Sequence, residues 1–114
     1  MASDFLHSTA WLKKRERILR RDGYMCQVAK RYGKRVPANI VHHILPRANF
    51  PEYALCDWNL ISVSMQGHKL LEDDCGLTDM GRALAVKTLR GRGLVVPEEL
   101  QRPPGSIAIL REAN

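Results

Sequence analysis

The chain has 114 residues, of which 18 are Lys or Arg and 12 are Asp or Glu, so its formal net charge at pH 7 is +6. This length predicts one domain with a core of modest size. The sequence has no apolar run long enough for a membrane span, and its start, MASDFLHSTA, lacks the basic flank and apolar core of a signal peptide. We therefore expect a cytoplasmic protein with no membrane partner.

The positive charge is concentrated at one end. Residues 1–47 carry eleven Lys or Arg against three Asp or Glu, whereas residues 48–114 carry seven against nine. A basic excess of this kind is typical of a phosphate-binding surface, because release of counterions supplies most of the non-specific affinity for DNA. The alternative is a solvated helix face in a basic protein.

The cysteines argue against two kinds of cross-link. Cys26, Cys56 and Cys75 are odd in number and form no CxxC pair. A disulfide framework and a cysteine-based zinc knuckle are both disfavoured.

The first predicted helix covers residues 9–22. Ser8 or Thr9 can cap it, Trp11 lies on its apolar stripe, and Gly23 can end it in a left-handed conformation. The opposite face is a basic ridge, which we expect to meet phosphate rather than only solvent. Its members are Lys13, Lys14, Arg15, Arg17, Arg20 and Arg21.

The middle of the chain predicts a strand, a long loop and a second strand. Residues 24–28 read as a short strand or turn, and 30–34 as a basic loop. Residues 35–41 form the first predicted strand and 60–63 the second, which alternates apolar and polar residues. The loop between them, 46–57, holds two prolines and several apolar residues that should pack it down.

Helices predominate after the second strand. Residues 64–67 read as a turn into a short helix over 68–73, and Thr78 caps a helix that extends to Leu89. Pro97 to Leu100 predicts one further helical turn. Residues 102–114 could be an edge strand, an oligomer contact or a tail. We expect a single domain over 1–101, with a motif core over 36–74, and a C-terminal tail over 102–114.

Three of the four histidines lie in the segment that joins these elements. His42 and His43 follow a β-branched run, and His68 opens the short helix. Imidazole is a ligand for divalent metals and a general base near neutral pH. The alternative for such a pair is one buried, hydrogen-bonded histidine and one exposed histidine, because neighbours on a regular strand point to opposite faces.

At these residues the chain resembles the HNH endonuclease family, the ββα-metal nucleases, and most closely their small phage and prophage members. The matching stretches are HSTAW from His7, RRDGYMCQ from Arg20, VHHILP from Val41, WNL from Trp58, and His68-Lys69. The resemblance implies an α+β fold. Its ββα-metal core would be a short two-stranded antiparallel hairpin plus a helix, with flanking N-terminal and C-terminal helices.

The resemblance also assigns roles. His42 and His68 match metal ligands, His43 matches the general base, and Asn59 matches the residue that braces the loop and fixes the base. Glu72 follows His68 by one helical turn and is a candidate third ligand, with a solvent-exposed glutamate as the alternative. From local sequence alone, Asn59 could equally be a turn residue.

One divalent metal ion is implied, with magnesium or manganese favoured over zinc or nickel. No structural zinc is expected, because three cysteines that hold it in many relatives are replaced here by Ala29, Ser64 and Gly67. DNA is the implied partner, with phage packaging proteins such as terminase as a further possibility, and the chain would be a monomer or homodimer. The residues expected to contact DNA are Lys13, Lys14, Arg17, Arg20, Arg21, Lys30, Arg31, Lys34, Arg35 and Lys69.

The sequence thus favours a metal-dependent DNA endonuclease of low sequence specificity, leaving 5′-phosphate and 3′-hydroxyl ends. One alternative is a catalytically inactive module of the same fold that binds DNA or serves assembly, which the missing zinc cysteines would suit. Another is a histidine-based zinc-binding protein, which would leave the basic helix unexplained.

Overall fold

The computed structural model describes residues 2–101, so the predicted tail over 102–114 lies outside the described residues. Contacts divide the chain into two compact units, Met1–His68 and Lys69–Asn114, with the boundary inside one helix. The expectation of one domain over 1–101 stays a prediction. Among the described residues no helix is long and apolar enough to cross a membrane.

Two helices open the first unit. Helix α1 spans Ala2–His7, which the sequence did not predict, and α2 spans Thr9–Arg21. The predicted cap at Ser8 is confirmed, because its side chain accepts a hydrogen bond from the backbone N–H of Trp11 at 3.1 Å. Gly23 follows the helix with a φ of +65°, a value that suits a residue without a Cβ.

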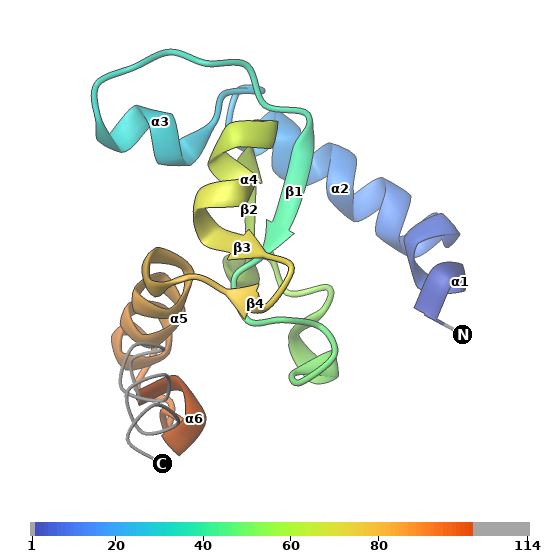
Figure 1. Ribbon diagram of the computed structural model, residues 1–114. Coiled ribbons are helices and arrows are strands. Elements are labelled where there is room, and N and C mark those ends of the chain that lie inside the picture. Colours follow the sequence, from blue (N-terminus) through green and yellow to red (C-terminus); the bar gives the residue numbers. More distant parts are fainter. Residues whose placement is uncertain (1, 102–114) are drawn as a thin grey trace. The chain divides into compact units, whose positions relative to one another are not determined.

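The two predicted strands pair as an antiparallel hairpin. Strand β1 spans Ile40–His43 and β2 spans Leu60–Val63, and in their register His42 lies opposite Ile61 and His43 opposite Leu60. Helix α2 packs against both strands (Figure 1). The bounds of β2 are confirmed.

The predicted first strand over 35–41 is wrong in its bounds. Residues 35–39 contribute only an isolated bridge between Met25 and Pro37, made by two hydrogen bonds of the flanking residues: the Cys26 N–H donates to the Val36 carbonyl and the Ala38 N–H to the Tyr24 carbonyl. Pairing with β2 begins only at Ile40, where Val63 lies opposite. Both histidines therefore belong to the strand itself.

The outer edge of β2 is occupied by two side chains from the end of α2. The guanidinium of Arg21 donates to the backbone carbonyls of Leu60 at 2.7 Å and Asp57 at 2.8 Å. The carboxylate of Asp22 accepts from the backbone N–H of Ser62 at 3.0 Å and is paired with Arg21. Two backbone groups of β2 that point away from β1, the Leu60 carbonyl and the Ser62 N–H, thereby have partners.

A short helix, α3, spans Gln27–Arg31 and packs against β2, where the sequence predicted a strand or turn followed by a loop. The connection between β1 and β2 contains two 3-10 turns, η1 over Pro51–Tyr53 and η2 over Asp57–Asn59.

Helix α4 spans Met65–Leu71 and begins before the predicted position, so the expected turn over 64–67 is wrong. Gly67 lies inside the helix and faces Cys26. A Cβ at Gly67 would lie 2.6 Å from the Cys26 sulfur, and the Ser64 hydroxyl lies 3.5 Å from the same sulfur. Three positions of the zinc site described for relatives are thus packed against one another.

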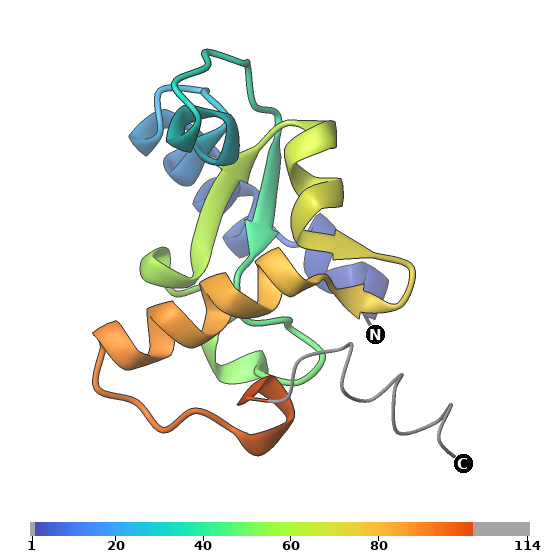
Figure 2. The same cartoon turned by 60° about the vertical axis from the view of Figure 1, so that its left-hand side comes forward.

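In the second unit, β3 (Glu72–Asp73) and β4 (Gly76–Leu77) form a minimal antiparallel pair. Helix α5 spans Asp79–Gly91 and confirms the predicted cap, since the Thr78 hydroxyl accepts from the N–H of Gly81. Helix α6, Glu98–Gln101, confirms the predicted last turn and packs against α5 (Figure 2).

Candidate metal and catalytic centre

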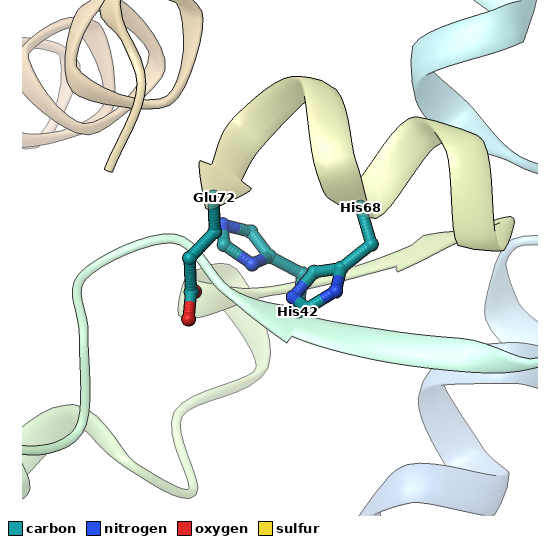
Figure 3. A group of neighbouring side chains, drawn as sticks. All are labelled: His42, His68 and Glu72. Atoms are coloured by element: carbon teal, nitrogen blue, oxygen red, sulfur yellow. The ribbon is translucent and has the colours of Figure 1, made fainter. Parts of the chain in front are cut away.

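The side chains of His42, His68 and Glu72 converge. One potential ligand atom from each lies within 4.8 Å of the other two. His42 comes from β1, His68 from α4, and Glu72 directly follows α4, so it is one helical turn beyond His68 (Figure 3). The rings of the two histidines meet edge to face with centroids 5.2 Å apart. Two imidazole nitrogens and a carboxylate oxygen form a donor set that suits a divalent transition metal.

The environment of His42 keeps its imidazole neutral. The side chain is 2% exposed, and this burial lowers its pKa to about 3, with the charges of His68 and His43 acting in the same direction. A metal binds the neutral ring through a nitrogen lone pair, so the protonation state of His42 near pH 7 is the one that a ligand requires.

His42 and His43 contact different helices. His42 meets His68 of α4, whereas the ring of His43 stacks on Trp11 of α2 with centroids 4.9 Å apart and an interplanar angle of 22°. This difference follows from the alternation of side chains along a regular strand. The two rings therefore do not form one ligand pair, and only His42 belongs to the group with His68 and Glu72.

The orientation of His43 fixes which ring nitrogen carries the proton. Its Nε2 lies 3.0 Å from the backbone carbonyl of Ala54. Because a carbonyl can only accept, Nε2 must donate, and the lone pair of the neutral ring is then on Nδ1. Burial lowers the pKa of His43; the Ala54 bond opposes this effect and the charge of Arg47 adds to it, so the pKa stays below its usual value.

Asn59 holds the loop that carries Ala54. The side chain is fully buried, and its Oδ1 accepts from the N–H of Leu45 at 2.7 Å. Its Nδ2 donates to the carbonyls of Leu45 at 3.2 Å and Tyr53 at 3.1 Å. Asn59 thus reaches His43 only through the backbone beside Ala54, and it lies outside the group of three possible metal ligands.

Several contacts of His43 were not predicted. Trp11, which lies on the apolar stripe of the predicted helix, is buried at 5% exposure, but it also forms the surface on which His43 stacks. Phe5 lies 6.1 Å from the His43 ring, and the guanidinium of Arg47 lies over Phe5 at 4.5 Å. The stretch HSTAW contained the signal for Trp11, whereas nothing in the sequence marked the Ala54 carbonyl.

The expected DNA-contacting residues fall into two groups. Four of them, all on α2, make intramolecular ion pairs: Lys14 and Arg17 with Asp57, Arg20 with Glu16, and Arg21 with Asp22. Lys14 is held most closely, with its ammonium 2.5 Å from the carboxylate and its side chain 22% exposed.

The second group consists of cations that make no ion pair within the described part of the chain. Across residues 2–101 no hydrogen bond or ion pair holds the side chains of Lys13, Lys30, Arg31, Lys34, Arg35 and Lys69. All six are exposed, and four of them lie on α3 or in the loop that follows it. The cations available to an external phosphate are therefore concentrated around α3 rather than along α2. A role for either group in binding DNA stays a prediction.

A hairpin followed by a helix, with a histidine of the first strand facing a histidine of the helix, defines the ββα-metal fold class. Among solved structures, the chain is similar to the HNH endonuclease of the deep-sea thermophilic bacteriophage GVE2, determined with a manganese ion. The two are 34% identical, the match covers 60% of this chain and 74% of the phage protein, and the TM-score is 0.58. No family model and no curated protein sequence matches the chain. This likeness shows that the chain belongs to the HNH endonuclease family.

Proposed function

We propose that this protein is a metal-dependent DNA endonuclease that hydrolyses phosphodiester bonds with little sequence specificity. The observation that carries the proposal is the convergence of His42, His68 and Glu72 within 4.8 Å, beside a separately oriented His43. Membership of the HNH family and the basic first half of the chain support it.

His42, His68 and Glu72 would hold one divalent ion. Their donor set fits, because two neutral imidazoles and one carboxylate leave coordination positions open for a phosphate oxygen or water. The ion, when bound, would stabilise the negative charge that develops on the phosphate and the leaving oxygen. Manganese is the metal in the phage relative's structure, and we extend it to this chain together with magnesium.

His43 would act as the general base. The Ala54 carbonyl holds the proton on Nε2, the stacked Trp11 holds the plane of the ring, and the lowered pKa keeps the ring neutral at pH 7. Nδ1 can then take a proton from the attacking water. Asn59 would serve this step indirectly, by bracing the loop that supplies the carbonyl.

The deciding experiment is relaxation of supercoiled plasmid by the purified protein with magnesium, manganese, nickel, zinc or EDTA, beside His43→Ala. Cleavage should require a metal and should fall by about 10²–10⁴-fold in the variant, the usual effect of removing a general base. DNA affinity in EDTA should be unchanged, because His43 makes no charged contact in this assignment.

A matched variant tests the metal ligands. His68→Ala should abolish cleavage and also weaken manganese binding in a calorimetric titration, whereas His43→Ala should leave manganese binding intact. If no metal supports cleavage while the protein still shifts DNA in a salt-sensitive way, the chain is the inactive binding module of the same fold. Equal activity of wild type and His43→Ala would refute the assigned base.

A further inference from the structure

A recess of about 460 Å³ opens in the first unit between α3 and the β1–β2 hairpin, separate from the three metal-ligand candidates. Lys30 and Arg31 of α3, Trp58 of η2 and Ile61 of β2 contribute to its lining. Its volume is in the range of sites that hold small ligands, and a single nucleotide is of that size class.

One lining residue of the recess, Ile61, lies on the same face of the hairpin as His42. Ile61 is the cross-strand partner of His42, and partners in an antiparallel pair point to the same face with their Cβ atoms about 5 Å apart. A strand of nucleic acid with one phosphate at His42 and His68 would therefore have a neighbouring part close to this recess.

The electrostatics of the recess favour an anion. Lys30 and Arg31 are exposed, and no hydrogen bond or ion pair with residues 2–101 occupies either side chain. The one acidic side chain in the lining, Asp22, is already neutralised by Arg21 and hydrogen-bonded to the N–H of Ser62. Both cations of α3 thus remain available for a phosphate.

The aromatic side of the recess suits a nucleobase. Trp58 is half-buried and packs against Tyr53 with ring centroids 4.9 Å apart and an interplanar angle of 56°. This contact holds the indole in place at the wall of the recess. A fixed aromatic ring beside free cations is the combination with which proteins hold bases of single-stranded nucleic acid, and it tolerates any base.

We propose that this recess binds one unpaired nucleotide of the DNA substrate, with its base against Trp58 and its phosphate at Lys30 and Arg31. The inference rests on the proposed nuclease function and narrows its substrate to strands with an unpaired nucleotide beside the cleaved bond. A base within an intact duplex is stacked between its neighbours and cannot reach the indole.

The test is binding of fluorescently labelled DNA by anisotropy in EDTA, with a single strand compared with a duplex of the same length. Trp58→Ala should weaken single-strand binding by about tenfold, the scale of one lost base stack, and duplex binding by less than about twofold. Trp58→Phe should retain most of the affinity, because it keeps a stacking surface and the contact with Tyr53.

Two further variants keep the test decisive if Trp58→Ala does not fold. Ile61→Trp fills the recess while all its cations remain, and it should weaken single-strand binding selectively. Lys30→Ala/Arg31→Ala should weaken single-strand binding more than Lys87→Ala/Arg90→Ala, which removes the same charge from exposed positions on α5. Circular dichroism and thermal unfolding verify that each variant is folded.

The proposal is overturned if folded Trp58 or Ile61 variants affect single strand and duplex equally, or affect neither. Because binding is measured without metal, this result is independent of cleavage. A wild-type protein that binds single strands through Trp58 but, with any of the metals, cuts neither plasmid nor single-stranded DNA would refute the nuclease function and leave the recess intact. Cleavage at the wild-type rate by folded Trp58 variants would support the nuclease function and refute the role of the recess.

Discussion

The two adjacent histidines of β1 have different surroundings, and this difference separates their chemistry. His42 is enclosed and faces His68, and one of its ring nitrogens lies within 4.8 Å of ligand atoms of His68 and Glu72. The ring of His43 stacks on Trp11, and its Nε2 is hydrogen-bonded to the Ala54 carbonyl. One ring is thereby suited to hold a metal and the other to move a proton.

Asn59 provides a test of how much the loop depends on one side chain. Asn59→Ala removes three hydrogen bonds, two of them buried and one partly buried, and leaves the backbone groups of Leu45 and Tyr53 without these partners. We expect the free energy of unfolding in urea to fall by about 3 kcal/mol, since each buried polar group left unsatisfied costs roughly 1–3 kcal/mol. Asn49→Ala, at an exposed position of the same loop, is the control. A loss below about 1 kcal/mol would mean that the loop is held elsewhere.

Asp22 predicts a pH dependence of stability. Burial raises its pKa, but the hydrogen bonds from Arg21 and Ser62 outweigh burial, so the folded-state pKa lies below that of a free aspartate. The stabilisation is therefore fully present above about pH 4 and is lost as the pH falls through the lower folded-state value.

Asp22→Asn should remove this contribution, about 1–2 kcal/mol at pH 6 for a charge-assisted hydrogen bond. The variant should lose less stability than wild type when urea unfolding is repeated at lower pH. Asp74→Asn removes an exposed carboxylate that makes no hydrogen bond or ion pair with residues 2–101, and it should keep the wild-type profile. Identical pH profiles for Asp22→Asn and wild type would contradict the assigned role.

At the scale of elements, α5 approaches the preceding chain closely at one glycine. A Cβ on Gly81 would lie 2.0 Å from the backbone carbonyl oxygen of Leu71, and backbone cannot move aside as a side chain can. Gly81→Ala should lower the free energy of unfolding by about 3 kcal/mol. Gly91→Ala, in the same helix with nothing within 4 Å, should be neutral or slightly stabilising. Equal effects of the two substitutions in thermal unfolding would disprove the close approach.

The sequence predicted elements well where local signals decide them. The caps at Ser8 and Thr78 and the strand over Leu60–Val63 each depend on nearby residues, and all three are confirmed. The sequence-based prediction failed where a residue far away in the sequence determines the local structure. Gly67 reads as a turn residue, but it is helical because only a glycine leaves room for the Cys26 sulfur.

The same distinction applies to the site. The spacing of His68 and Glu72 and the motif around His42 were enough to predict that these residues could share a metal, and the structure brings them together. The Ala54 carbonyl that orients His43 belongs to the backbone, so no residue type reveals it. The internal ion pairs of α2 were also missed, because Asp57 is far from that helix in the sequence.

At the scale of the whole molecule, the number of basic residues overstates the number of cationic side chains that are available to contact DNA phosphates. Lys34 and Arg35 are exposed and make no ion pair with residues 2–101, whereas Lys14 is held by Asp57. Lys34→Ala/Arg35→Ala should reduce the slope of log affinity against log salt by about 1.8 for duplex DNA, about 0.9 for each lost phosphate contact. Lys14→Ala should instead lower the free energy of unfolding, with a smaller change in slope. An unchanged slope in the double variant would place the DNA elsewhere.

The way Arg21 and Asp22 occupy the outer side of β2 limits how copies of this protein can associate. An exposed strand edge is a template on which another chain can add a strand, a common route to dimers and to aggregation. Here the carbonyl of Leu60 and the N–H of Ser62 already have partners from α2. The edge of a two-stranded sheet is otherwise open to pairing with a further strand. Here Arg21, which the sequence predicted to contact DNA, covers this edge instead. A homodimer of this chain would have to form through other surfaces, and Arg21→Ala is the substitution that would reopen this edge.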